Sequence, residues 1–150
     1  MPTTPIVKDW KELLEFLNAN QVKYLVVGGV ALSCYAAPRY TGDIDIFIEA
    51  SSENAQCILK ALDAFGFGSV GITLADLTNE DMIIQLGFPP HRVDLITKIS
   101  GVGFEEAWEN KVVGELYGIQ VNLISKEDLL KNKLASGRPK DLADANSLKE

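Results

Sequence analysis

The chain has 150 residues, of which 47% are hydrophobic, and its 14 basic and 21 acidic side chains give a net charge of −7. This length predicts one domain spanning residues 1–150 with a single core. The acidic balance argues against broad, nonspecific nucleic-acid binding, which depends on neutralising phosphates. Because the chain shows neither a membrane-length apolar run nor a signal peptide, we expect a cytoplasmic protein with no membrane partner.

The first half of the chain is predicted to alternate helices with short strands. Gly28-Gly29 breaks an apolar run, and Pro38 stops the helix that follows. Ser51 offers N-cap chemistry for a third helix. The expected helices cover residues 9–20, 30–37 and 51–63, and the expected strands cover residues 24–27 and 44–48.

The second half begins with a glycine-rich connector over residues 65–71, followed by a stretch over 74–80 that fits either a short helix or a turn. Gly137 is expected to end one helix and Pro139 to start the next. The remaining pattern predicts strands over 82–86 and 92–97, a helix over 103–110, a hairpin over 111–124, and helices over 125–136 and from 139 onward. This order predicts an α/β (α+β) domain with a mixed sheet.

Two aspartates stand out at the start of the second strand. Asp43 and Asp45 flank Ile44, so their side chains project from the same side of the strand. Carboxylates that close repel each other unless a cation lies between them. A hard divalent cation such as Mg²⁺, or Mn²⁺, suits oxygen ligands of this kind.

The Gly28-Gly29 turn lies upstream of this pair, with residues 30–42 between them. Two residues without Cβ let a ligand approach the backbone, and the N–H groups of the following helix can receive phosphate. A phosphate-binding turn followed by D-x-D on a strand indicates a site for a nucleotide and a metal.

The segment from Tyr24 to Glu49 resembles the polymerase-beta-type nucleotidyltransferase superfamily, whose signature is an apolar strand, G-[GS], an intervening stretch and D-x-[DE]. The fuller string G-G-x-A…P-R-x-T-x-D-I-D is more similar to the small prokaryotic nucleotidyltransferases related to AbiEii-type toxins. The resemblance implies the nucleotidyltransferase fold, a metal-dependent enzyme and a nucleoside triphosphate substrate. It also implies a toxin–antitoxin setting with a cognate antitoxin as partner.

Asp94 is the candidate third carboxylate, because it interrupts an apolar strand where a buried charge needs a partner or a metal. In the superfamily the third acid occupies such a position. Three carboxylates on neighbouring strands can hold two metal ions, and Asp94 can also act as a general base toward the acceptor. The alternative is an aspartate on an edge strand that faces solvent, and Glu49 is the nearest rival for its role.

Further nucleotide-binding candidates come from the resemblance. Arg39 and Thr41 belong to the R-x-T-x-D string, and Arg39 can either steady the aspartates or contact a triphosphate. The string K-L-A-S-G-R-P-K-D-L-A-D matches a lysine followed by R-x-K-D-x-x-D in the toxin-related group. Lys133 is the first choice for a phosphate contact and Lys140 the second. The alternative is an exposed helix with ordinary surface charges, and Asp141 and Asp144 can cap it, pair with Arg138 or flank the site.

These features predict an enzyme that moves a nucleoside monophosphate from a triphosphate to an acceptor hydroxyl. The acceptor can be RNA such as tRNA, a protein side chain or a small molecule, and the resemblance favours tRNA or protein. The alternative is a silent module that keeps the fold and binds only nucleotide or a partner chain. A dinucleotide-binding domain is disfavoured, since the chain lacks G-x-G-x-x-G.

Overall fold

The computed structural model describes residues 5–36, 38, 41–66 and 71–149. Within these residues the chain forms one six-stranded mixed sheet with the strand order β3-β4-β2-β1-β6-β5. The strands are β1 (Tyr24–Val27), β2 (Asp43–Ile48), β3 (Ile83–Leu86), β4 (Arg92–Ile96), β5 (Val112–Leu116) and β6 (Ile119–Leu123). The predicted fold class, an α/β (α+β) domain with a mixed sheet, is therefore confirmed.

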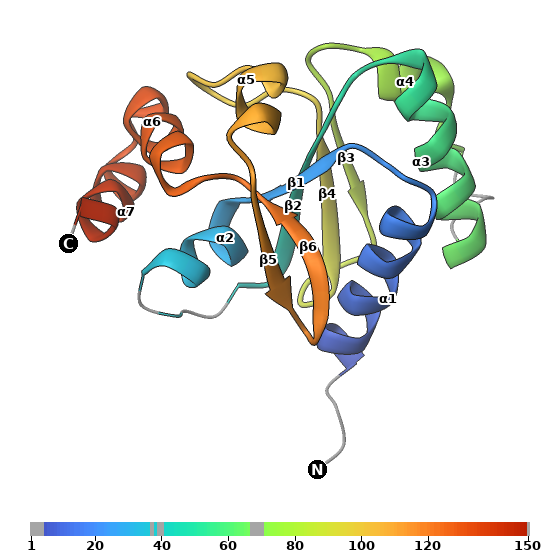
Figure 1. Ribbon diagram of the computed structural model, residues 1–150, viewed down its shortest axis with the longest axis horizontal. Helices are drawn as coiled ribbons and strands as arrows, with labels where there is room; N and C mark the ends of the chain where they lie inside the picture. Colours follow the sequence, from blue (N-terminus) through green and yellow to red (C-terminus); the bar gives the residue numbers. More distant parts are fainter. Residues whose placement is uncertain (1–4, 37, 39–40, 67–70, 150) are drawn as a thin grey trace.

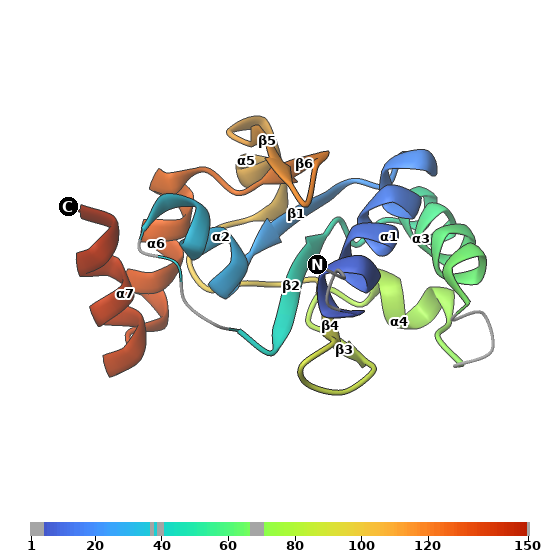
Figure 2. The same ribbon diagram turned by 90° about the horizontal axis from the view of Figure 1, so that it is seen from below.

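Helices lie on both sides of the sheet. The helices are α1 (Pro5–Ala19), α2 (Gly28–Tyr35), α3 (Ser52–Phe65), α4 (Leu74–Thr78), α5 (Phe104–Glu109), α6 (Lys126–Ser136) and α7 (Pro139–Lys149). Figures 1 and 2 show α1, α3 and α4 together on one side, and α2, α6 and α7 on the other. None of the helices in the described part of the chain is long and apolar enough to cross a membrane.

Local signals account for most element boundaries. Ser51 accepts a hydrogen bond from the Asn54 N–H at the start of α3, and Ser125 does the same for Asp128 at the start of α6. Gly137 ends α6 in the left-handed region, as the sequence indicates. The ambiguous stretch over 74–80 forms the short helix α4. The expected connector at 65–71 lies partly outside the described residues.

Two helices begin earlier than expected. Helix α1 begins at Pro5 rather than residue 9, because a proline tolerates the first turn, where its missing N–H would have no partner. Helix α2 begins at Gly28 rather than residue 30, so the glycine turn is also the helix start. The strand therefore passes directly into the helix at the predicted phosphate-binding turn.

Strand register places the aspartates. Strands β2 and β4 run parallel, with Asp45 opposite Asp94 and Asp43 opposite Arg92. Strand β1 runs antiparallel to β2, so Val27 lies opposite Asp45 and Gly28 follows immediately. The alternating residues Ile44, Ile46, Val93 and Leu95 are buried in the core. The core thus fixes one face of both strands and turns the polar residues to the other face.

Candidate active site

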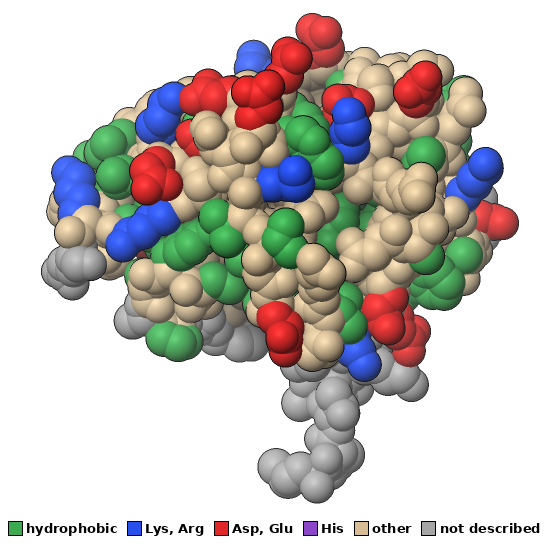
Figure 3. Space-filling view, viewed as in Figure 1, with side chains coloured by type: hydrophobic (Ala, Val, Ile, Leu, Met, Phe, Trp, Pro, Cys, Tyr) green, Lys and Arg blue, Asp and Glu red, His purple; other side chains and the backbone are tan. Residues whose placement is uncertain are grey.

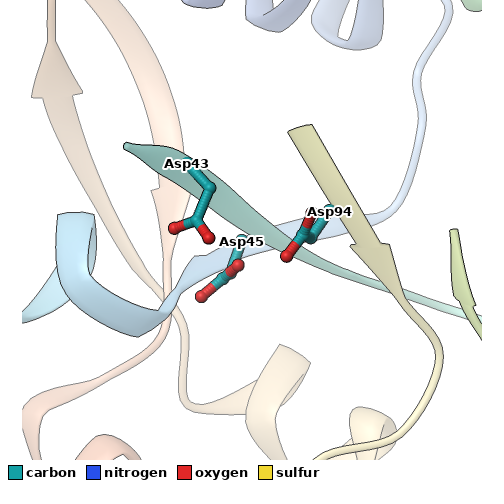
Figure 4. Close-up of side chains that lie close together, drawn as sticks. All are labelled: Asp43, Asp45 and Asp94. Atoms are coloured by element: carbon teal, nitrogen blue, oxygen red, sulfur yellow. The ribbon is translucent and has the colours of Figure 1, made fainter. Parts of the chain in front are cut away.

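Asp43, Asp45 and Asp94 converge on one face of the sheet. One carboxylate oxygen from each residue lies within 4.8 Å of the other two, and Figure 4 shows the three side chains directed toward one space. Asp94 is buried, whereas Asp43 and Asp45 are half-buried. The solvent-facing alternative for Asp94 is wrong, because β3 covers the outer edge of β4 and leaves Asp94 7% exposed. Three oxygens at this separation suit a divalent cation.

The environment of Asp45 opposes its ionisation. Burial raises the pKa of this carboxyl, and the charges of Asp43 and Asp94 raise it further, to about 7. The charge of Arg92 counteracts only part of this effect. A divalent cation at this position would remove the repulsion, so the electrostatics of the three carboxylates are consistent with a metal site.

Arg92 is the main residue that sequence reasoning missed. Its Nη2 donates to Oδ2 of Asp43 at 2.6 Å, and its Nε donates to Oδ1 of Asp94 at 2.9 Å. Nη2 also lies 3.2 Å from Oδ2 of Asp94. The hydrogen bond to Asp94 raises the pKa of Arg92 above its ordinary value, so the guanidinium stays charged. The sequence contains one signal for the contact between Arg92 and Asp94: the string R-x-D on a single strand places both side chains on the same face.

Gly28 and Gly29 bring the start of α2 against the aspartates. Gly28 has a φ of +66°, and a Cβ there would lie 2.1 Å from Oδ2 of Asp45. At Gly29 a Cβ would meet Oγ1 of Thr41 at 3.4 Å. The N-cap residue Val27 gives α2 no side-chain cap, so the first N–H groups of the helix are available to an anion.

Thr41 supports the pair of aspartates from the chain segment before β2. Its hydroxyl lies 3.0 Å from the backbone oxygen of Asp43 and 3.1 Å from Oδ1 of the same residue. This contact orients Asp43 and brings Thr41 beside Gly29. Arg39, the other candidate from the same string, lies outside the described residues.

A cleft of about 290 Å³ runs from the aspartates to the junction of α6 and α7. Of the three aspartates, Asp45 lines it, together with Gly28. The facing walls come from the segment after β4 and from the helix junction, and include Lys98, Ser100, Asn132, Lys133, Ser136 and Arg138. The structure thus places the glycine turn, one carboxylate and several cationic or hydrogen-bonding side chains around one cleft.

Lys133 reaches this cleft but is already paired. It is buried, and its Nζ lies 3.2 Å from Asp144 and 3.5 Å from Asp141. Burial alone would raise the pKa of Asp141, yet hydrogen bonds from Arg138 and Ser136 and the charge of Lys133 lower it to about 2. Of the alternatives left open for Asp141, pairing with Arg138 is observed, with an Nε–Oδ2 distance of 2.6 Å.

Lys140 lies apart from these groups. It is exposed near the start of α7 and is not among the described residues that line the cleft. The exposed Lys98, on the segment that follows β4, does line it. A sequence search confined to family motifs does not find Lys98, because its position becomes informative only once β4 lies beside β2.

A larger cavity of about 490 Å³ lies on the other face of the sheet. Trp10, Phe65, Phe88 and Val93 contribute to its lining. Val93 stands between Arg92 and Asp94 in β4, so its side chain points away from the aspartates. This cavity is separated from the carboxylates by the sheet.

The chain matches the model of a known family. A family model described as "Nucleotidyltransferase of unknown function (DUF6036)" matches residues 6–149. No curated protein matches the chain.

Proposed function

Because the chain belongs to this family of nucleotidyltransferases of unknown function, we propose that it moves a nucleoside monophosphate from a nucleoside triphosphate to an acceptor hydroxyl. Asp43, Asp45 and Asp94 would hold Mg²⁺ or Mn²⁺. The observation that carries the proposal is the convergence of three carboxylates, within 4.8 Å, beside a glycine turn. Hard cations prefer such oxygen ligands and commonly share them with substrate phosphates.

The residues around the carboxylates have separable roles. When bound, a divalent cation neutralises the triphosphate and orients its reacting phosphorus. The N–H groups at the start of α2 would bind phosphate oxygens, since Gly28 and Gly29 leave the backbone accessible. Thr41 would hold Asp43 in position through the hydrogen bonds described above.

The contacts of Asp94 and Lys133 alter the roles that we propose for them. Both oxygens of Asp94 accept hydrogen bonds from Arg92, so Asp94 is better placed to hold charge than to take a proton from the acceptor. Lys133 is engaged by two carboxylates, so the exposed Lys98 joins it as a candidate for phosphate contacts across the cleft. Arg138 also lines the cleft and is exposed, although it pairs with Asp141.

The acceptor that we propose is a macromolecule. The resemblance to toxin-related enzymes favours tRNA or a protein side chain over a small molecule, with an antitoxin as partner. Because the chain carries a net charge of −7, we expect it to contact only a short part of its acceptor, near the reacting hydroxyl, and not a long stretch of phosphate backbone. On the face shown in Figure 3, lysine and arginine side chains are scattered among acidic ones, which gather around α5. Extended phosphate backbones bind best to continuous basic surfaces.

The alternative is a silent module that binds nucleotide or a partner chain without turnover. One observation favours it: the Arg92 guanidinium already pairs with two of the three aspartates. A site that needs no metal could be stabilised in this way. Metal-dependent transfer of the nucleotide to an acceptor separates the two functions, because a silent module can still bind nucleotide.

The test is calorimetric titration with ATP, CTP, GTP and UTP, each with and without Mg²⁺. We expect one triphosphate to bind only with the metal, and Asp43→Asn/Asp45→Asn to abolish this binding. Asp63→Asn, which changes an exposed carboxylate on α3, is the matched control and should bind as wild type does. If no triphosphate binds to the folded wild type, the transferase proposal is wrong.

If a triphosphate binds, acceptor transfer is measured next. The bound triphosphate, labelled at its α-phosphate, is incubated with total tRNA and with cell protein. Label in a macromolecule, absent with the double variant, identifies the acceptor class. If the triphosphate binds but no label is transferred to tRNA, to protein or to small hydroxyl compounds, the silent module is favoured.

A further inference from the structure

The position of Arg92 is fixed by the sheet. It is the first residue of β4 and lies opposite Asp43 in the parallel register of β2 and β4. Asp94 follows two residues later and therefore projects from the same face. The Arg92 side chain is only 26% exposed, and its guanidinium spans the gap between the two strands. Its contacts thus depend on backbone pairing and not on a mobile loop.

The guanidinium satisfies Asp94 in a two-pronged arrangement. Nε and Nη2 approach the two oxygens of Asp94 at 2.9 and 3.2 Å, and Nη2 also reaches Asp43 at 2.6 Å. Planar guanidinium groups match carboxylates in this way, and they keep their charge at every physiological pH. A permanent positive charge therefore lies between Asp43 and Asp94.

Asp45 occupies a different position. The structure gives no ion pair between Arg92 and Asp45 among the described residues, and Asp45 is the aspartate that lines the cleft, against Gly28. When all three aspartates are ionised, one guanidinium leaves two negative charges to balance. Before a triphosphate binds, one divalent cation balances that charge, and the guanidinium already lies between Asp43 and Asp94.

We propose that Arg92 is a positioning residue that stays between Asp43 and Asp94 and takes the place of a second metal ion. The site then accepts one divalent cation, on the Asp45 side that faces the cleft. This inference rests on the proposed function and narrows it, because three carboxylates on neighbouring strands would otherwise suit a two-ion arrangement.

The test counts bound ions by electron paramagnetic resonance of Mn²⁺. The protein is titrated with Mn²⁺ and with a non-hydrolysable analogue of the triphosphate that binds in calorimetry. Two Mn²⁺ ions about 3.5–4 Å apart couple to each other and give a spectrum unlike that of an isolated ion. We expect wild type to bind one uncoupled ion, and Arg92→Gln to bind a coupled pair.

Two further variants control the experiment. Arg92→Lys keeps the positive charge and is expected to retain the single ion. Lys60→Gln removes a positive charge from the exposed surface of α3 and should match wild type. Circular dichroism checks that each variant folds. If Arg92→Gln does not fold, the wild-type spectrum still tests the inference, because a coupled pair at saturating Mn²⁺ would overturn it.

The outcomes separate the inference from the proposed function. A coupled pair in wild type would show that Arg92 gives way to a second ion, and the inference would be wrong while the transferase proposal stands. A single ion in both wild type and Arg92→Gln would show that Arg92 does not set the number, with the same consequence. Absence of metal-dependent nucleotide binding would overturn the proposed function and the inference with it.

Discussion

At Gly28 the backbone approaches Asp45 so closely that no side chain fits between them. The φ of +66° places this residue in the left-handed region, and an added Cβ would lie 2.1 Å from Oδ2 of Asp45. Both constraints point to glycine, one through backbone strain and the other through space. Gly29 has neither constraint, because its φ lies outside the left-handed region and its Cβ would approach Thr41 no closer than 3.4 Å.

We therefore predict that Gly28→Ala lowers the free energy of unfolding by about 2 kcal/mol and weakens Mn²⁺ binding, because Asp45 must move. Gly29→Ala, one residue away, should stay within about 0.5 kcal/mol of wild type. Urea denaturation and Mn²⁺ titration measure the two effects. Equal losses in both variants would show that the approach of Gly28 to Asp45 is not the limiting constraint.

Contacts within one strand can be predicted from the sequence, whereas contacts between distant elements cannot. The proximity of Asp43 and Asp45 follows from strand alternation alone. The contact of Arg92 with Asp43 does not, because it depends on the parallel register of β2 and β4. The family motif identifies Lys133 as a candidate phosphate ligand, but its two carboxylate partners depend on the packing of α6 against α7.

At the scale of elements, the junction of α6 and α7 is held by a buried charge cluster. Lys133 on α6 lies between Asp141 and Asp144 on α7, and the three side chains are at most 10% exposed. Arg138, at the junction, adds a second cation to Asp141. Since this junction also forms a wall of the cleft, its stability and the shape of the site are linked.

Lys133→Met is predicted to lower the free energy of unfolding by about 3 kcal/mol, because it removes the cation between two buried carboxylates. Lys140→Met, on the exposed surface of α7, should change stability by less than about 0.5 kcal/mol. Thermal and urea unfolding of both variants give the comparison. If Lys133→Met unfolds like wild type yet loses triphosphate binding, Lys133 serves the ligand and not the helix junction.

For the whole molecule, the elements were more predictable than their arrangement. Gly28, Pro38, Gly137 and Pro139 mark boundaries through local backbone preferences, so helices and strands could be placed from the sequence. Strand order could not, because β2 pairs with β1 on one side and with β4 on the other through contacts distant in sequence. The site depends on that order, since it brings the starts of β2 and β4 and the α6–α7 junction together.

The fold holds three carboxylates close together, and they repel one another when ionised. We expect this repulsion to make the free energy of unfolding depend on pH. In the metal-free protein the pKa of Asp45 is raised to about 7, above its usual value near 4. As the pH rises from about 4 to 7, the unfolded chain has lost the Asp45 proton while the folded protein keeps it. Folding is therefore progressively disfavoured across this range.

We predict that wild type in EDTA is less stable at pH 8 than at pH 5.5. Ionisation of Asp45 should account for on the order of 2 kcal/mol of this loss, or about 5 °C in Tm, and Asp45→Asn should abolish that part. Saturating Mn²⁺ should raise the Tm more at pH 8 than at pH 5.5, because the ion binds ionised carboxylates and has no proton to displace. Differential scanning calorimetry of both proteins, with EDTA and with Mn²⁺, measures this difference. An equal Mn²⁺ effect at the two pH values, in wild type and Asp45→Asn alike, would place the ion away from Asp45 and contradict the proposed site.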